Sequence, residues 1–131
     1  MRGWKLVTLV LLAGCAVESQ PATPVSVAIH NGSERPLRCL LVFAHWTTID
    51  LPVLRPGGSA PMTLYRAADR ALFLPRAGDG RRMMLEALHC GYDDAWSQSL
   101  VRLDWTAAMR SGETRFVLDC AAGERPACRW K

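Results

Sequence analysis

The chain has no apolar run long enough to cross a bilayer as a helix. Spanning the hydrocarbon core takes about 20 consecutive apolar residues, and the apolar run near the start of the chain covers only Leu6 to Ala13. Lysine is also scarce, since Lys5 and Lys131 are the only two and every other basic residue is arginine. The formal net charge is +4 over 131 residues. A balance this small argues against nucleic acid as a partner.

Motifs of common catalytic machinery are missing as well. The sequence has no Gly-x-Ser-x-Gly nucleophile elbow, no glycine-rich phosphate loop and no His-Glu-x-x-His metal motif. Its three histidines, His30, His45 and His89, are scattered singly, and no Cys-x-x-Cys pair is present. We therefore predict that the protein is not an enzyme and that it carries no cofactor.

The first 15 residues contain the most informative motif. Two basic residues precede the apolar run Leu6 to Leu12, and small residues then lead to a cysteine in the sequence Leu12-Ala13-Gly14-Cys15. A short apolar segment behind positive charges and ended by small residues is typical of a cleavable signal peptide. The four residues that end at Cys15 resemble the lipobox of bacterial lipoproteins.

This resemblance implies that residues 1–14 are a lipoprotein signal peptide, that Cys15 receives a diacylglycerol, and that the new amine is acylated. Two or three fatty chains hold a protein on a membrane far more firmly than one. The residue after the cysteine is Ala16 and not Asp, which in a two-membrane bacterium favours the outer membrane over the inner membrane. An ordinary secretory signal, with Cys15 incidental, is the alternative.

Cleavage before Cys15 would leave 117 residues with a net charge of +2, a normal size for one domain. Residues 15–23 have no apolar periodicity, and we expect the lipidated cysteine followed by a flexible tether. Fully extended, residues 16–23 reach about 26–29 Å. Residues 24–131 are then expected to form the single folded domain.

Four cysteines remain after Cys15, namely Cys39, Cys90, Cys120 and Cys128. An even count in an exported chain predicts two disulfides. Pairing Cys39 with Cys90 and Cys120 with Cys128 is favoured, because a glycine and a proline between the last two let the chain fold back. The alternative pairs Cys39 with Cys120 and Cys90 with Cys128, since Cys39 and Cys120 both fall on the apolar faces of their predicted strands.

Turn signals at short intervals divide the domain into short segments that alternate apolar and polar residues. The predicted strands are 25–29, 37–46, 47–54, 62–66, 71–76, 82–90, 99–105 and 115–120. Only 66–70 and 105–110 are expected as helical turns. This pattern predicts an all-β fold, a small antiparallel β-sandwich of about seven strands with two disulfides, with immunoglobulin-like topology as one option. The continuous apolar run Leu37–Trp46 predicts a central strand covered on both faces, and Asn31-Gly32 predicts a turn.

The candidate binding residues are Tyr92, Asp93, Asp94, Trp96 and Trp130. The first four share one loop, where carboxylates can hydrogen-bond sugar hydroxyls while the rings stack on a pyranose. The same composition also fits a solvated turn whose aromatic rings pack back onto the domain. Trp130 lies in a basic segment, and it is either a contact for lipid or a partner, or a lid over one end of the domain.

A soft copper site is a further possibility, because imidazole and thioether groups suit copper. Its members would be His45, His89, Met62, Met83 and Met84. Neighbouring residues on a strand face opposite ways, so Met83 and Met84 cannot both join it. No metal ligands are therefore predicted.

Taken together, these features predict a lipid-anchored envelope lipoprotein in the outer membrane, facing the periplasm. We expect it to act as a non-catalytic binding or scaffolding module for an envelope protein or glycan. The alternative is a carrier or sensor for a small ligand, glycan or metal, through the Tyr92–Trp96 loop or the histidine and methionine set. A hydrolase is the third interpretation.

Overall fold

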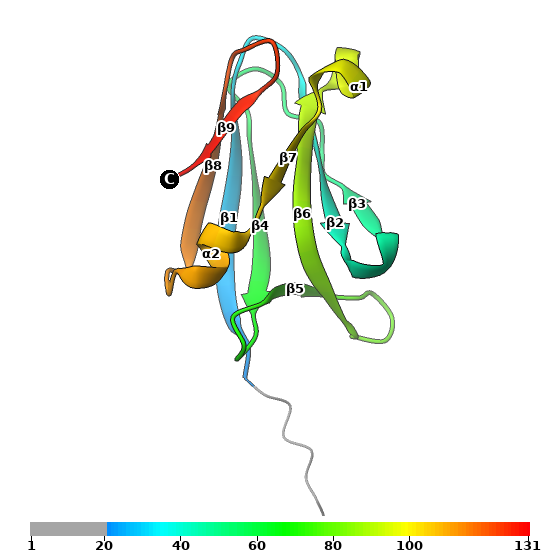
Figure 1. Ribbon diagram of the computed structural model, residues 1–131, viewed down its shortest axis with the longest axis vertical. Coiled ribbons are helices and arrows are strands. Elements are labelled where there is room, and N and C mark those ends of the chain that lie inside the picture. Colours follow the sequence, from blue (N-terminus) through cyan, green and yellow to red (C-terminus); the bar gives the residue numbers. More distant parts are fainter. Residues whose placement is uncertain (1–20) are drawn as a thin grey trace, which may run out of the picture.

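Nine β-strands dominate residues 21–131, which are the residues that the computed structural model describes (Figure 1). The strands are β1 (Thr23–Gly32), β2 (Leu37–Phe43), β3 (Thr48–Asp50), β4 (Ser59–Arg66), β5 (Leu72–Pro75), β6 (Arg82–Tyr92), β7 (Val101–Asp104), β8 (Arg115–Ala121) and β9 (Ala127–Trp130). The helical segments are η1 (Ala44–Trp46), η2 (Asp93–Ala95), α1 (Trp96–Ser99) and α2 (Thr106–Arg110). Within residues 21–131, no helix has the length and apolar character needed to cross a membrane. The predicted signal peptide and Cys15 lie outside the described residues.

The strands form one continuous mixed sheet in the order β3-β2-β6-β5-β4-β1-β8-β9, and β7 also pairs with β6. Strand β5 lies across the lower end of the molecule and links the two halves of the sheet (Figure 1). The pair β1 and β8 is parallel, so the prediction of an antiparallel sheet is wrong at this position. The segment containing α2 returns the chain to the end where β1 begins, and β8 therefore starts beside β1 and runs in the same direction.

The structure has nine strands where about seven were expected. Strands β1 to β8 each overlap one of the eight predicted ranges, and η1 separates β2 from the three-residue strand β3. The C-terminal segment adds β9, which pairs with β8 and was not predicted. Residues 106–110 are helical as predicted, but 66–70 end β4 and turn toward β5, and Asn31-Gly32 still belongs to β1.

Both halves of the sheet contribute to a single hydrophobic core. Alternate residues of β1 are fully buried, because successive side chains of a strand point to opposite faces. Leu41 of β2 and Leu118 of β8 belong to the same cluster as Val27 of β1. The cluster extends from Val25 to Trp130 and includes cysteines of both disulfides. The described segment therefore contains a complete core of its own.

Each disulfide joins directly opposite residues of two neighbouring strands. Cys39 of β2 is bonded to Cys90 of β6, and Cys120 of β8 is bonded to Cys128 of β9. The favoured pairing is confirmed, and the alternative pairing is wrong. The sulfur atoms of Cys90, Cys120 and Cys128 all lie within 4.8 Å of one another, so the two cystines meet in the core.

The Cys39–Cys90 cystine and Trp46 do not have the arrangement typical of immunoglobulin-like domains. Such domains carry a cystine between their two sheets, with a tryptophan packed against it. Here Cys39 and Cys90 lie on adjacent strands of one half of the sheet. Trp46 is 96% exposed, so it does not pack on the cystine.

Candidate functional site

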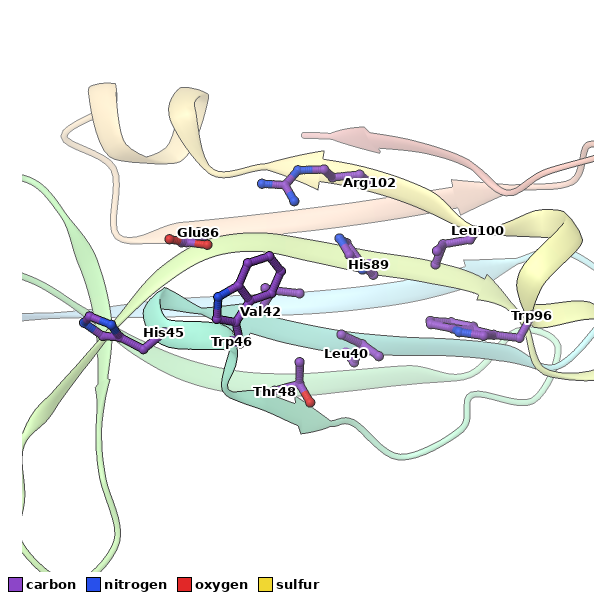
Figure 2. Close-up of a pocket in the computed structure, with 10 residues that line it drawn as sticks. All are labelled: Leu40, Val42, His45, Trp46, Thr48, Glu86, His89, Trp96, Leu100 and Arg102. Atoms are coloured by element: carbon purple, nitrogen blue, oxygen red, sulfur yellow. The ribbon is translucent and has the colours of Figure 1, made fainter.

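An open groove of about 460 Å³ lies on the outer face of the half of the sheet formed by β3, β2, β6 and β7 (Figure 2). We call it the outer-face groove. Its lining residues are Leu40, Val42, His45, Trp46, Thr48, Glu86, His89, Trp96, Leu100 and Arg102. Small-molecule sites in proteins commonly enclose about 300–1,000 Å³, so this groove has a suitable size for a small ligand.

The floor of the groove comes from the outward-facing residues of β2. Cys39, Leu41 and Phe43 point into the core, and Leu40 and Val42 therefore point outward. The sequence predicted this strand to be covered on both faces. In the structure the outer face of Leu40 and Val42 is instead the floor of an open groove, and apolar surface remains available there.

Polar side chains reach the groove from β6 and β7. His89 lies opposite Leu40 on one side and opposite Arg102 on the other, so these three residues form a row across the three strands. Glu86 and Arg102 are exposed. Together with His45, these side chains place one carboxylate, one guanidinium and two imidazoles around an apolar floor.

Trp46 lines the part of the groove nearer η1, and Trp96 lines the opposite part (Figure 2). The backbone of η1 places Trp46 there by a tight turn, in which the Phe43 amide donates to the Thr47 carbonyl at 2.8 Å. His45 and Trp46 have φ angles of 65° and 64°. Left-handed backbone costs about 1–2 kcal/mol for each non-glycine residue. Strain of this kind concentrates at functional sites.

Trp96 is held in place by the strand beneath it and by an arginine. A Cβ atom added to Gly91 would lie 3.0 Å from the Trp96 ring, so a larger residue here would push the ring a few tenths of an ångström away from β6. The Arg38 guanidinium lies 4.6 Å from the ring centroid and also donates to Asp50 at 2.9 Å. The cation–π contact and the ion pair together orient the ring.

His89 carries the most unusual polar group of the groove. Its Nε2 atom is buried and has no hydrogen-bond partner among residues 21–131. Burial lowers the pKa of the His89 ring below its ordinary value of 6.5, and the Arg102 guanidinium lowers this pKa further. Both causes favour the neutral form of the ring, in which one nitrogen donates a hydrogen bond and the other accepts one.

The structure separates the aromatic residues that the sequence grouped in one loop. Tyr92 is 1% exposed, and its hydroxyl donates to the Gly123 carbonyl at 2.8 Å. The Arg35 guanidinium lies 4.1 Å from the centroid of the Tyr92 ring. The Tyr92 ring is therefore buried between protein groups and does not line the outer-face groove. Trp96, by contrast, lines the outer-face groove.

The two carboxylates of this loop lie apart from the groove. Asp94 forms an ion pair with Arg35 at 2.6 Å. Asp93 is exposed, and its amide donates to the Pro36 carbonyl at 3.0 Å. Neither lines the outer-face groove, so only Trp96 of the four loop residues contributes to it.

Trp130 packs on the core beside two other aromatic rings. Its centroid lies 5.0 Å from that of Trp105 and 6.3 Å from that of Phe116. Trp130 is partly buried. Trp130 pairs with Leu118 in the middle of β8, so its ring covers part of the core along the sheet and not at an end of the domain.

The residues considered for copper are not brought together. His45 and His89 both line the outer-face groove. Met83 and Met84 line a second hollow, which includes His45 but not His89. Met62 lies in β4 and lines neither hollow. In the described part of the chain, the cysteine sulfurs that approach one another are bonded in disulfides.

Several groove residues escaped the sequence analysis. Trp46 was assigned to a buried central strand, and Glu86 and Arg102 were treated as ordinary polar positions. One signal was present: Leu40 and Val42 gave β2 a second apolar face that no other predicted element was assigned to cover.

Comparison of the chain with protein-family models, with curated proteins and with solved structures finds no match.

Proposed function

We propose that this protein is a lipid-anchored, non-catalytic binding module of the bacterial envelope, and that the outer-face groove is its ligand site. The lipobox motif supports the anchor. The binding role rests on one observation above all: two tryptophans line an apolar groove in which His89 Nε2 has no hydrogen-bond partner among the described residues. Trp46 in particular is almost fully exposed, although large apolar side chains are usually covered.

The ligand that best fits this lining is a glycan. A pyranose ring has apolar faces that stack on Trp46 and Trp96, and hydroxyls at its edges that hydrogen-bond to Glu86, His89 and Arg102. Glycoside hydrolysis usually requires a pair of carboxylates, and Glu86 is the one carboxylate among the lining residues. The lining therefore supports binding without hydrolysis.

A protein partner is the second candidate, and a different observation favours it. Trp46, Ile49 and Val53 are the exposed large apolar residues of the described chain. All three lie on or beside β3, which is an edge strand of three residues. Clustered apolar residues at an edge are typical of protein contacts.

We also propose that the two halves of the sheet are the two layers of a small sandwich. The support is the shared core, in which inward residues of β1, β4 and β8 pack with inward residues of β2 and β6. Strand β5 would then form the corner between the layers (Figure 1).

Glycan-array binding and calorimetry test the groove. Trp46→Ala and Trp96→Ala should each weaken binding of the selected glycan about tenfold or more, because buried aromatic anchors dominate such interfaces. Val53→Ala removes an exposed apolar side chain outside the groove and should leave affinity unchanged. Equal affinity in all three variants would overturn the glycan assignment. In-cell crosslinking at Ile49 to one envelope protein would then support the second candidate.

Labelling cells with a radioactive fatty acid tests the anchor independently. The wild-type chain should be labelled and should fractionate with membranes, whereas Cys15→Ser should remain unlabelled with its leader attached. Mass spectrometry of the native N-terminus provides the control. An unmodified N-terminus at any other residue would contradict the lipoprotein assignment.

A further inference from the structure

The connections between strands lie at two opposite ends of the molecule, four at each end (Figure 1). At the end where β1 begins, which we call the proximal end, they are 44–47, 67–71, 76–81 and 105–114. At the other, distal end they are 33–36, 51–58, 93–100 and 122–126. Strand register supports this grouping, because Thr23 at the start of β1 pairs with Arg66, and Arg66 pairs with Leu72.

The two ends differ in charge. The proximal connections and the strand termini that they join contain Arg66, Arg70, Arg76, Arg81, Arg82, Arg110 and Arg115 against Asp69, Asp79, Asp104 and Glu113. The distal connections and strand termini contain Arg35, Arg55 and Arg125 against Glu34, Asp50, Asp93, Asp94 and Glu124. The proximal end is therefore net positive and the distal end net negative.

A second hollow, of about 390 Å³, opens at the proximal end beside η1 and the β5–β6 hairpin. Arg76, Arg81 and Arg82 line it together with His45 and Thr47. Arg76 is ion-paired with Asp79, and the Arg82 guanidinium lies 4.4 Å from the centroid of the Phe73 ring. The lining residues include three arginines and no carboxylate. A planar guanidinium group can donate two parallel hydrogen bonds to two oxygens of one phosphate. A hydroxyl such as that of Thr47 adds a further donor.

The expected lipid anchor joins the domain at the proximal end, and this attachment turns the positive end toward the membrane. The chain enters the domain at Thr23, and residues 16–23 reach at most about 26–29 Å when extended. Arg66 is buried and donates to the Ala108 and Glu113 carbonyls. A domain tethered through this end presents the remaining arginines to the leaflet that holds the lipid. Anionic headgroups attract basic side chains within about one Debye length, roughly 8 Å at physiological salt.

We propose that the proximal end is a membrane-facing surface and that its arginine-lined hollow binds the phosphate of anionic lipid headgroups. The orientation of the domain on the membrane rests on the lipid anchor of the proposed function. The attraction between the arginines and anionic headgroups does not depend on that anchor. The outer-face groove then runs along the side of a domain that stands on the leaflet, with Trp46 at its membrane end and Trp96 farther from the membrane.

Hydrogen–deuterium exchange of the acylated protein tests this surface. Protein purified from membranes is reconstituted into phosphatidylcholine vesicles with and without phosphatidylglycerol. Amides of 44–47 and 76–82 should exchange more slowly in the anionic vesicles, and amides of 122–126 should not change. High salt should remove the difference. Equal exchange in the two vesicles, or protection of 122–126 alone, would overturn the proposal.

A charge-matched pair of variants locates the effect. Arg81→Gln with Arg82→Gln should abolish the protection, whereas Arg55→Gln with Arg125→Gln removes the same charge from the distal end and should leave it intact. Loss of protection in both pairs would show attraction by net charge alone and would overturn the site.

If the protein proves not to be acylated, vesicle flotation at low salt still tests whether the proximal end binds anionic headgroups. Without an anchor, the protein should float with phosphatidylglycerol vesicles and not with phosphatidylcholine vesicles. The proximal double variant should bind the anionic vesicles about 30-fold more weakly, at about 1 kcal/mol for each arginine. Failure to float with anionic vesicles would overturn the surface, whereas absent acylation alone overturns only the anchor.

Discussion

At the scale of single residues, the outer-face groove depends on backbone positions as much as on its side chains. The left-handed conformation of His45 and Trp46 lifts the indole of Trp46 clear of the sheet. The missing side chain of Gly91 lets the Trp96 ring approach β6 at the other end. Both features place an aromatic ring beside the same apolar floor. The backbone conformation at Trp46 is unfavourable for an L-residue.

His89 gives the groove a pH dependence. We expect NMR titration of its ring to yield a pKa below 6.5, because burial and then Arg102 disfavour the charged form. Arg102→Gln removes only the second cause and should raise this pKa without restoring the ordinary value. A ring pKa of 6.5 or higher in the wild-type protein would contradict the expectation.

The same shift affects folding stability with a definite sign. The unfolded chain binds a proton at His89 near pH 6.5, whereas the folded protein binds it only at lower pH. The His89 contribution is therefore fully present above pH 6.5 and is lost as the pH falls through the folded pKa. The loss should be absent from His89→Gln, which serves as the matched control in urea unfolding at several pH values.

At the scale of elements, the two disulfides should contribute unequally to stability. They close loops with sequence separations of 51 and 8 residues, and the chain-entropy relation gives about 4 and about 2.5 kcal/mol, respectively. Cys39→Ala with Cys90→Ala should thus reduce the free energy of unfolding more than Cys120→Ala with Cys128→Ala. Urea denaturation followed by circular dichroism measures both. A larger loss from the shorter loop would show that packing outweighs chain entropy here.

The sequence predicted those elements whose formation depends on local pattern. The alternation of apolar and polar residues predicted strands at 25–29 and 115–120, and these lie within β1 and β8. Features set by distant contacts were not predictable in this way. The parallel pairing of β1 with β8 depends on where α2 returns the chain, and β3 is short because Trp46 leaves the strand direction.

The candidate site was only partly predictable for a related reason. Trp96 was named because it lies in a polar, aromatic loop, but its partner across the groove lies 50 residues earlier in the chain, at Trp46. Tyr92 has the same local context as Trp96, yet it turns inward and bonds to Gly123. Tyr92 is the last residue of β6 and Trp96 is the first residue of α1. The residue at which the strand ends thus decides which ring faces outward, and the local composition does not predict that residue.

At the scale of the whole molecule, the residue after the proposed anchor should determine which membrane holds the domain. The lipoprotein resemblance predicts that Ala16→Asp retains the protein in the inner membrane of a two-membrane bacterium, while fatty-acid labelling is unchanged. Sucrose-gradient separation of the two membranes measures this. Ala16→Ser is the matched control and should keep the outer-membrane position. Identical distributions for wild type and Ala16→Asp would contradict the sorting prediction.

The ends of the sheet have a consequence for molecules confined to a surface. Its path terminates in β3 and β9, which contain only three and four residues. Long unpaired edges invite strand addition between identical chains, and short ones offer few free amides and carbonyls. Lipid-bound molecules diffuse in two dimensions and meet often. Edge strands as short as β3 and β9 let such molecules collide repeatedly without growing into fibrils by strand addition.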